Sequence, residues 1–306
     1  MAFDVTKMID TDYMNETREK LIAKMVLEGI TMSEIKVIPG IKNSIALNLV
    51  DNTITVQDGT CGWNAAGTMS LGQKKLAVSP KKVNDSLCPK DLEKLYLGEF
   101  MRSNKELPFT EIFSDTYVNR VKRYNEQVLW DGDADDIDGF VKLVGDSTAV
   151  VDASVAVAAA TTAMGKVNAM IAAAPSELLE AENKIIFCSY GFYNQYATEL
   201  RAANVFMLAN TDYKNGDYKM YIPGTDIRLV ATVGLDNLTN NTVDTGSLLI
   251  FTFGDNLVAG TDMLDDEEMF DIWYSRDNDE VRVNIQWKLG TQTYFDDRIV
   301  RGYTLV

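Results

Sequence analysis

Histidine is absent from this 306-residue chain, and cysteine is scarce. Without histidine, the Ser-His-Asp triad, the Cys-His pair and histidine-ligated metal centres are excluded. The cysteines Cys61, Cys88 and Cys188 are far apart and form no Cys-x-x-Cys pair, which favours a reduced, intracellular protein. No stretch approaches the ~20 apolar residues of a membrane span, and the first ten residues lack the apolar core of a secretory signal. We therefore expect a cytoplasmic protein with no membrane partner and no cofactor.

Acidic residues outnumber basic ones, and the excess is confined to one part of the chain. Residues 1–130 hold 17 Lys and Arg and 17 Asp and Glu, whereas residues 131–306 hold 12 and 28, which accounts for the whole net charge of −16. Such a surface disfavours direct clamping of nucleic-acid phosphates, because that needs Lys and Arg. The acids could also serve solubility alone.

The first half of the chain predicts an arm, a hairpin and a long helix. Residues 14–27 and 89–104 have loose helical spacing. Between 35 and 80, short apolar runs separated by turn residues predict an extended hairpin that is too polar to hold a core of its own. In 109–130, apolar residues recur at steps of three and four, which predicts a helix of roughly 33 Å.

The second half alternates helices and strands and ends in strands. The pair of strands around 276–279 is a clear hairpin. We expect an α+β fold with an early projecting hairpin. The predicted elements are an alanine-rich helix over 154–174, a buried strand at 184–188, a helix over 189–204, and strands at 227–233, 247–253, 269–275, 280–289 and 293–300, and an apolar stretch at 139–144 precedes them.

An acidic run between 131 and 138 invites comparison with a calcium-binding EF-hand loop. That loop needs Gly at its sixth position and Glu at its twelfth, where this chain has Asp136 and Lys142. The match fails, so we expect a solvated acidic turn and no metal site.

A second acidic run includes Asp262 and Asp271 and precedes a strand. Paired carboxylates hydrolyse glycosidic bonds only when two of them face each other across a sugar-sized cleft, which a contiguous run does not provide. We therefore expect no catalytic residue, and favour a solvated edge or a charged contact between subunits.

Four lysines within nine residues lie in the electrically neutral part of the chain. They could face solvent, nucleic acid, or the acidic part of a neighbouring copy, and such complementarity is how a self-assembling subunit sets its orientation. The candidates for contacts between subunits are Lys74, Lys75, Lys81, Lys82, Asp262, Asp265, Asp266, Glu267 and Glu268.

Several segments, in this order over about residues 89–306, resemble the tailed-bacteriophage major capsid proteins of the HK97-type fold. The segment NEQVLWDGDADDIDGFVKLVGD is similar to the end of that family's spine helix and the passage into its axial domain. The other segments are NKIIFCSYGFYNQYATELRAAN, MYIPGTDIRLVATVGL, FTFGDNLVAGTDM and VRVNIQWKLGTQTYFDDRIV.

The resemblance implies five regions. They are an N-terminal arm (1–30), an extended hairpin called the E-loop (31–85), a peripheral domain with the spine helix (86–130), an axial domain (131–255) and the closing strands of the peripheral domain (256–306).

It also implies a structural subunit without enzymatic activity. Copies would form pentamers and hexamers of an icosahedral shell that encloses double-stranded DNA without sequence-specific binding. The partners would be a scaffolding protein, a portal and possible decoration proteins, and the shell would be assembled in the host cytoplasm to become part of the virion. Two alternatives stay open: an encapsulin-type compartment shell protein, which resembles the same fold, and a carboxylate enzyme or sugar-binding module.

Overall fold

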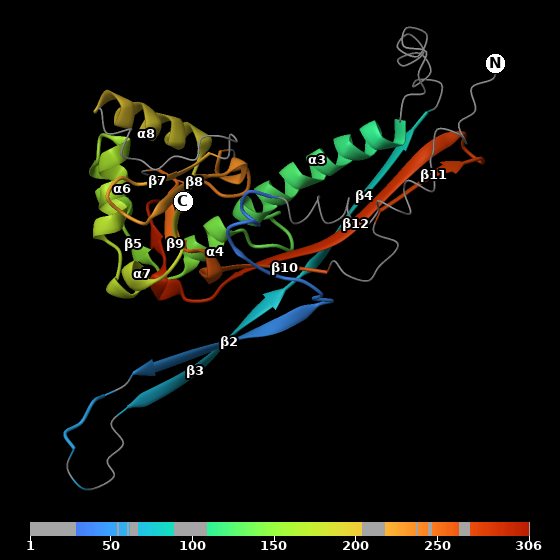
Figure 1. The fold of residues 1–306 in the computed structure, drawn as a ribbon. Helices are drawn as coiled ribbons and strands as arrows, with labels where there is room; N and C mark the ends of the chain where they lie inside the picture. The colour runs from blue at the N-terminus through green and yellow to red at the C-terminus, as the bar shows by residue number, and fades with distance from the viewer. Residues whose placement is uncertain are drawn as a thin grey trace.

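The structure is a computed structural model and combines a body of two β-sheets and helices with one projecting hairpin (Figure 1). The ranges it describes are 29–53, 55–59, 61, 67–88, 109–203, 218–236, 238–243, 247–262 and 270–305.

A five-stranded sheet is built around one long strand, β12 (Glu280–Thr293). β4 (Ser79–Leu87) pairs with it on one side, and β11 (Phe270–Ser275) and β10 (Leu257–Thr261) pair in succession on the other, all antiparallel. β1 (Lys36–Ile38) lies parallel to β10. Buried and more exposed residues alternate from Glu280 to Leu289 of β12, which explains why it forms a strand with one face in the core, and the alternation breaks at the buried Gly290.

The helix α3 (Phe109–Asp131) has 23 residues, about 34 Å at ~1.5 Å each, and it runs along this sheet (Figure 1). Val118, Val121 and Val128 belong to the core cluster that also contains Val283 and Ile285 of β12. The prediction of a long helix over 109–130 is therefore confirmed.

A second, six-stranded sheet forms the other end of the body. Its central strand β6 (Lys184–Cys188) is buried at every residue because both faces of the sheet are covered. Ile185 and Phe187 face the cluster that contains Trp130, while Ile186 and Cys188 face the cluster of the outer helices. The strand order is β5 (Val151–Asp152), β13 (Val300–Arg301), β9 (Ile250–Phe253), β6, β8 (Arg228–Ala231) and β7 (Lys219–Tyr221).

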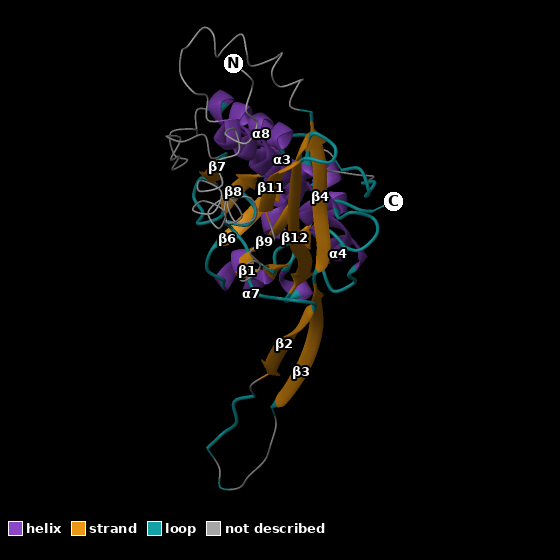
Figure 2. Cartoon of the chain, turned by 90° about the vertical axis from the view of Figure 1, so that its right-hand side faces the viewer, coloured by secondary structure: helices purple, strands orange, loops and turns teal. Residues whose placement is uncertain are grey.

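Short helices surround this second sheet (Figure 2). The helix α8 begins after Ser189, whose hydroxyl accepts a hydrogen bond from the amide of Phe192, and it buries one aromatic face. The helices are α4 (Phe140–Asp146), α5 (Ser154–Ala159), α6 (Ala163–Ala172), α7 (Ser176–Glu180) and α8 (Tyr190–Ala202), with single 3₁₀ turns η4 (Val233–Leu235), η5 (Gly254–Asn256) and η6 (Asp296–Arg298).

The hairpin of β2 (Ser44–Thr53) and β3 (Thr68–Ala77) forms a separate two-stranded sheet that extends away from the body (Figures 1 and 2). The predicted projecting hairpin is confirmed.

Two sequence predictions need correction, and one stretch gains an assignment. The alanine-rich helix over 154–174 is two helices, because Thr162 is extended and its hydroxyl caps α6 by accepting from the amide of Gly165. The apolar stretch at 139–144, for which the sequence analysis names no helix or strand, lies mostly in the helix α4. The strand at 293–300 is interrupted, because the side chain of Asn256 binds both the amide and the carbonyl of Phe295.

Three predictions lie wholly or almost wholly outside the described residues: the arm over 1–30, of which residues 1–28 are outside, the helix over 89–104, and the acidic residues between 263 and 269. Among the helices that the structure describes, none has the length and apolar character needed to cross a membrane.

Candidate intersubunit surface

Two glycines form the seat on which the hairpin meets the body. Gly260 of β10 and Gly290 of β12 are direct neighbours in the sheet, so their missing side chains leave one shared space. A Cβ at Gly290 would overlap the carbonyl oxygen of Ala77, and a Cβ at Gly260 would lie 3.0 Å from side-chain atoms of Leu76 and Val78. The end of the hairpin fills this space.

A small apolar cluster, here called the seat cluster, holds the base of the hairpin there. Its members are Ile41, Leu47, Leu76, Val78 and Val258, and all five are buried. At about 1.5–3 kcal/mol for each fully buried aliphatic side chain, this cluster is a main source of the hairpin's attachment to the body.

Farther out, the hairpin exposes apolar side chains on one face. Val50 is paired with Leu71, and Met69 follows two residues away on the same face of β3. Their exposed fractions are 52%, 73% and 65%. Nothing within the described part of the chain covers them, so this face, here called the apolar hairpin face, is suited to contact another protein surface.

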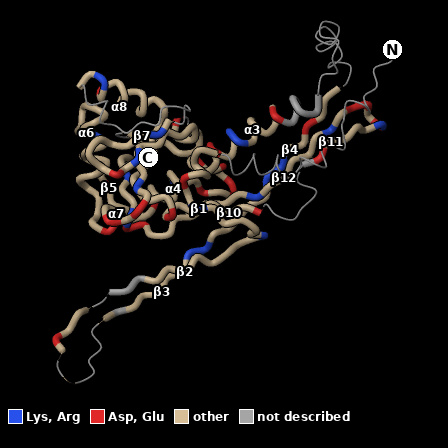
Figure 3. Tube along the Cα trace, viewed as in Figure 1, with Lys and Arg blue, Asp and Glu red and all other residues tan. Residues whose placement is uncertain are grey.

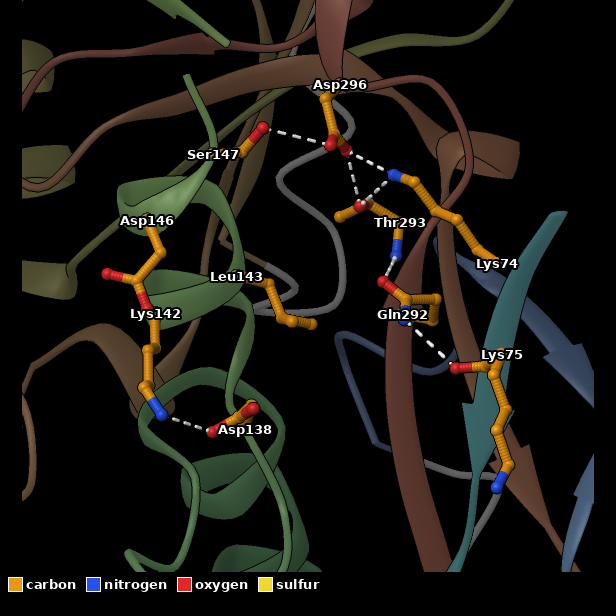
Figure 4. A pocket seen from close by; sticks show the side chains of 10 residues that line it. All are labelled: Lys74, Lys75, Asp138, Lys142, Leu143, Asp146, Ser147, Gln292, Thr293 and Asp296. Carbon is orange, nitrogen blue, oxygen red and sulfur yellow. Dashed lines mark hydrogen bonds and ion pairs between the residues drawn. The ribbon is translucent and has the colours of Figure 1, made fainter. Parts of the chain in front are cut away.

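Two of the four predicted lysines form ion pairs within the chain. The ammonium group of Lys74 lies 2.6 Å from Oδ1 of Asp296 and 3.1 Å from the hydroxyl of Thr293 (Figure 4). Lys81 pairs with Asp133 and lies 3.8 Å from Asp136. Lys74 therefore ties β3 of the hairpin to the body, Lys81 ties β4 to the turn after α3, and a role for either lysine between copies stays a prediction.

The other two lysines point away from these partners. Lys75 follows Lys74 on β3, and Lys82 follows Lys81 on β4, so each projects from the opposite face of its strand. Both are exposed, and neither has an ion pair with a residue that the structure describes. Positive charge is visible where the hairpin joins the body (Figure 3).

The first acidic run is only in part the solvated turn that the sequence predicts, because Asp135, Asp136 and Asp138 are exposed but its first aspartate is buried. Asp131 is 1% exposed, and its carboxylate accepts hydrogen bonds from the amides of Thr239, Asn240 and Asn241. Burial alone would raise the pKa of Asp131, but these bonds lower it. The carboxylate therefore connects the end of α3 to the 239–241 turn.

Asp133 has a comparable structural role. Burial alone would raise its pKa, but hydrogen bonds from Lys81 and from the amides of Ile137 and Asp136 lower it to about 2. Within the described ranges, no three Cys, Asp or Glu residues are arranged to hold a metal ion.

Of the second acidic run, the structure places Asp262 in an ion pair within the chain. This buried carboxylate lies 2.5 Å from the ammonium group of Lys288 on β12. Asp265, Asp266, Glu267 and Glu268 lie outside the described residues. Contacts of the run with a neighbouring copy stay a prediction.

Two hollows of about 470 and 460 Å³ are present on the described surface. The first lies between β3 and α4 and is lined by lysines and aspartates, including Lys75 and Asp146 (Figure 4). The second lies beside α3 and is lined by residues that include Glu126 and Tyr190. Asp262 lines neither of these two hollows.

The sequence analysis missed Asp296, Ser147 and the glycine pair. Gly260 and Gly290 lie inside strands of the structure, where a glycine often marks a close backbone approach, but the sequence analysis predicts no strand over either position. Asp296 is 222 residues from Lys74 and 149 from Ser147 in sequence, and no local pattern indicates that they meet.

Comparison of the sequence with models of protein families, and with curated proteins, finds no match. Comparison of the structure does find similar chains. A chain from the satellite phage P4 procapsid, which includes the size determination (Sid) protein, is 10% identical, with a TM-score of 0.55 over 94% of this chain and 99% of that one.

Two further chains belong to other capsids. The capsid of an empty GTA particle gives 11% identity and a TM-score of 0.57 over 92% of each chain. The capsid of cyanophage P-SCSP1u gives 10% identity and a TM-score of 0.56 over 91% of this chain and 88% of that one. The α+β fold of the HK97-type capsid proteins, predicted from the sequence, is therefore confirmed.

Proposed function

We propose that the chain is the structural subunit of the icosahedral head shell of a tailed phage, and that the shell encloses double-stranded DNA. The observation that carries the proposal is the apolar hairpin face, which extends beyond the last contact of the hairpin with its own body. The match of the fold to capsid chains over more than nine-tenths of this chain supports it.

In an assembled shell, the hairpin lies across a neighbouring copy. Val50, Met69 and Leu71 are each half or more exposed, so covering them removes apolar surface from water at about 25 cal/mol per Å². Such a contact is heterologous, because the hairpin of one copy meets a different surface of the next. Repetition of a heterologous contact around an axis closes a ring, as a pentamer or hexamer requires.

Charge would set the register of that contact. Lys75 and Lys82 are the exposed pair of the four lysines, and we assign them to the acidic surface of a neighbouring copy. The 265–268 acids are the proposed partners from the second acidic run, since Asp262 is neutralised by Lys288. The N-terminal arm would tie neighbours together, and the axial regions would meet at the symmetry axes.

The role is structural and not enzymatic, and its partners follow from it. Copies of the chain would assemble in the host cytoplasm with a scaffolding protein and a portal, with decoration proteins as possible additions. The net charge of −16 fits a wall that encloses DNA without gripping its phosphates.

Size-exclusion chromatography and electron microscopy of the purified chain, with and without its scaffolding partner and over a salt series, test the proposal. We expect closed shells or rings, and we expect salt to weaken them because exposed charge pairs are screened. The double variant K75E/K82E should assemble poorly at low salt. The control K142E, which changes a lysine of α4 and removes its surface ion pair with Asp138, should assemble normally.

A monomer under all conditions would contradict the proposal. Nuclease-resistant DNA inside particles from infected cells would distinguish a phage head from a compartment that encloses proteins.

A further inference from the structure

Lys74 marks the boundary between the seated and the free part of the hairpin. On the body side of it, Leu76 and Val78 are buried in the seat cluster. On the far side, Leu71 and Met69 are exposed, and Gln73 bonds across the hairpin to Asn48. Contacts at this boundary therefore control the direction in which the free part extends.

The carboxylate of Asp296 joins three segments at this boundary (Figure 4). Its Oδ1 accepts from the ammonium group of Lys74 on β3 and from the hydroxyl of Thr293 at the end of β12, each at 2.6 Å. Its Oδ2 accepts from the hydroxyl of Ser147, directly after α4, at 2.9 Å. We call this group of four residues the hairpin clamp.

The clamp faces open space. The hollow of about 470 Å³ separates β3 from α4, with Lys142, Leu143 and Asp146 on the helix side. A turn of the hairpin toward α4 would therefore meet solvent and not a packed core. Beside the clamp and the seat cluster, the side chain of Gln292 also holds this stretch by donating to the carbonyl of Lys75 at 3.1 Å.

We propose that Asp296 is a positioning residue that fixes the angle at which the hairpin leaves the body, and thereby the place on a neighbouring copy that the hairpin reaches. This inference rests on the proposed shell function. From Lys74 to Thr68 the strand extends roughly 20 Å at ~3.3 Å per residue, so a rotation of roughly 15° moves its end by ~5 Å, about one strand spacing. A change of that size alters the curvature of a shell.

Distance measurements on spin-labelled, unassembled subunits test the inference directly. One label is placed at Leu71→Cys and one at Leu179→Cys, both exposed positions, after Cys61 and Cys88 are replaced by serine. The parent should give one narrow distance distribution.

We expect D296N and K74M to broaden that distribution or shift it by several Å. The reversed pair K74E/D296K should restore it, and K75M, which removes the neighbouring lysine without touching the clamp, should leave it unchanged. K74M keeps the bonds of Asp296 to Thr293 and Ser147, so it tests the clamp if D296N does not fold.

An unchanged distribution in D296N and K74M would overturn the inference. The proposed function is tested separately. Subunits that never assemble, but whose label distance changes in the clamp variants, would contradict the shell function and support the role of Asp296. Normal shells whose label distance is the same in the parent and the clamp variants would support the shell function and contradict the role of Asp296. Where both hold, electron microscopy of D296N particles should show a wider range of shell diameters than the parent.

Discussion

Replacing Gly290 with alanine should displace the base of the hairpin and prevent assembly. The new Cβ would overlap the carbonyl oxygen of Ala77 and lie 3.1 Å from Cα of Val78. Because both neighbours are backbone atoms, no change of side-chain rotamer makes room for it. The junction between β3 and β4 has to move, and the seat cluster moves with it.

The expected cost follows from this geometry. At an unstrained strand position, Gly→Ala stabilises a protein by about 0.5–1 kcal/mol because the unfolded chain loses freedom. Forcing an extra methyl group into a well-packed site costs about 1–3 kcal/mol, and here the shifted backbone also loosens Leu76 and Val78. We therefore expect G290A to lower the free energy of unfolding by about 2 kcal/mol.

The matched control lies in the same hairpin. A Cβ at Gly72 of β3 would lie 3.5 Å from Cβ of Leu49, an ordinary van der Waals contact, so G72A should be neutral or slightly stabilising. Urea unfolding followed by tryptophan fluorescence measures the stability, and particle counts in negative-stain electron microscopy measure assembly. If G290A unfolds and assembles as G72A does, the glycine seat does not hold the hairpin and the reasoning is refuted.

Three further predictions concern the apolar hairpin face and two buried carboxylates. L71N should prevent assembly without lowering the midpoint of thermal unfolding, because Leu71 is exposed in the subunit. The control L179N on α7, also at an exposed leucine, should assemble normally. Equal particle yields from L71N and L179N would argue against a hairpin contact. D131N should lower the free energy of unfolding by about 2 kcal/mol in urea titrations, because an amide NH₂ would face the backbone donors. Since the folded-state pKa of Asp131 is lowered, its stabilisation is present above the unfolded pKa of about 3.9 and is lost as pH falls through the folded value, so a constant difference between pH 6 and pH 3 would contradict this role. Burial raises the pKa of Glu126, although its carboxylate accepts hydrogen bonds from the amide and the hydroxyl of Thr31. Ionisation of Glu126 therefore costs folding stability as pH rises through its folded-state pKa. E126Q should be more stable than the parent by about 1 kcal/mol at pH 7, and the gain should shrink toward pH 4. A less stable E126Q at pH 7 would show that the two hydrogen bonds outweigh burial.

Elements with a strong local pattern could be predicted from the sequence. The helix α3, the strand β6, the helix α8 and the β11–β12 hairpin all follow from periodicity and from turn residues a few positions apart. The break between α5 and α6 could not, because alanine favours helix on both sides, whereas Ala160 is extended where α5 ends and Thr162 is extended and caps α6.

The site could be predicted only in part, because sequence identifies charges but not their partners. The four lysines were found as a group, but their division depends on which strand face each occupies after folding. Lys74 reaches Asp296 and Lys81 reaches Asp133, whereas Lys75 and Lys82 face outward. Likewise, the Asp131 carboxylate is buried by a turn more than a hundred residues away, which no spacing rule indicates.

Cryo-electron microscopy of particles formed by the purified chain with its scaffolding partner tests the central claim most directly. We predict closed icosahedral shells in which Val50, Met69 and Leu71 of each hairpin are covered by an adjacent copy. Particles in which these side chains remain exposed to solvent, or a chain that stays monomeric under every condition, would contradict the account.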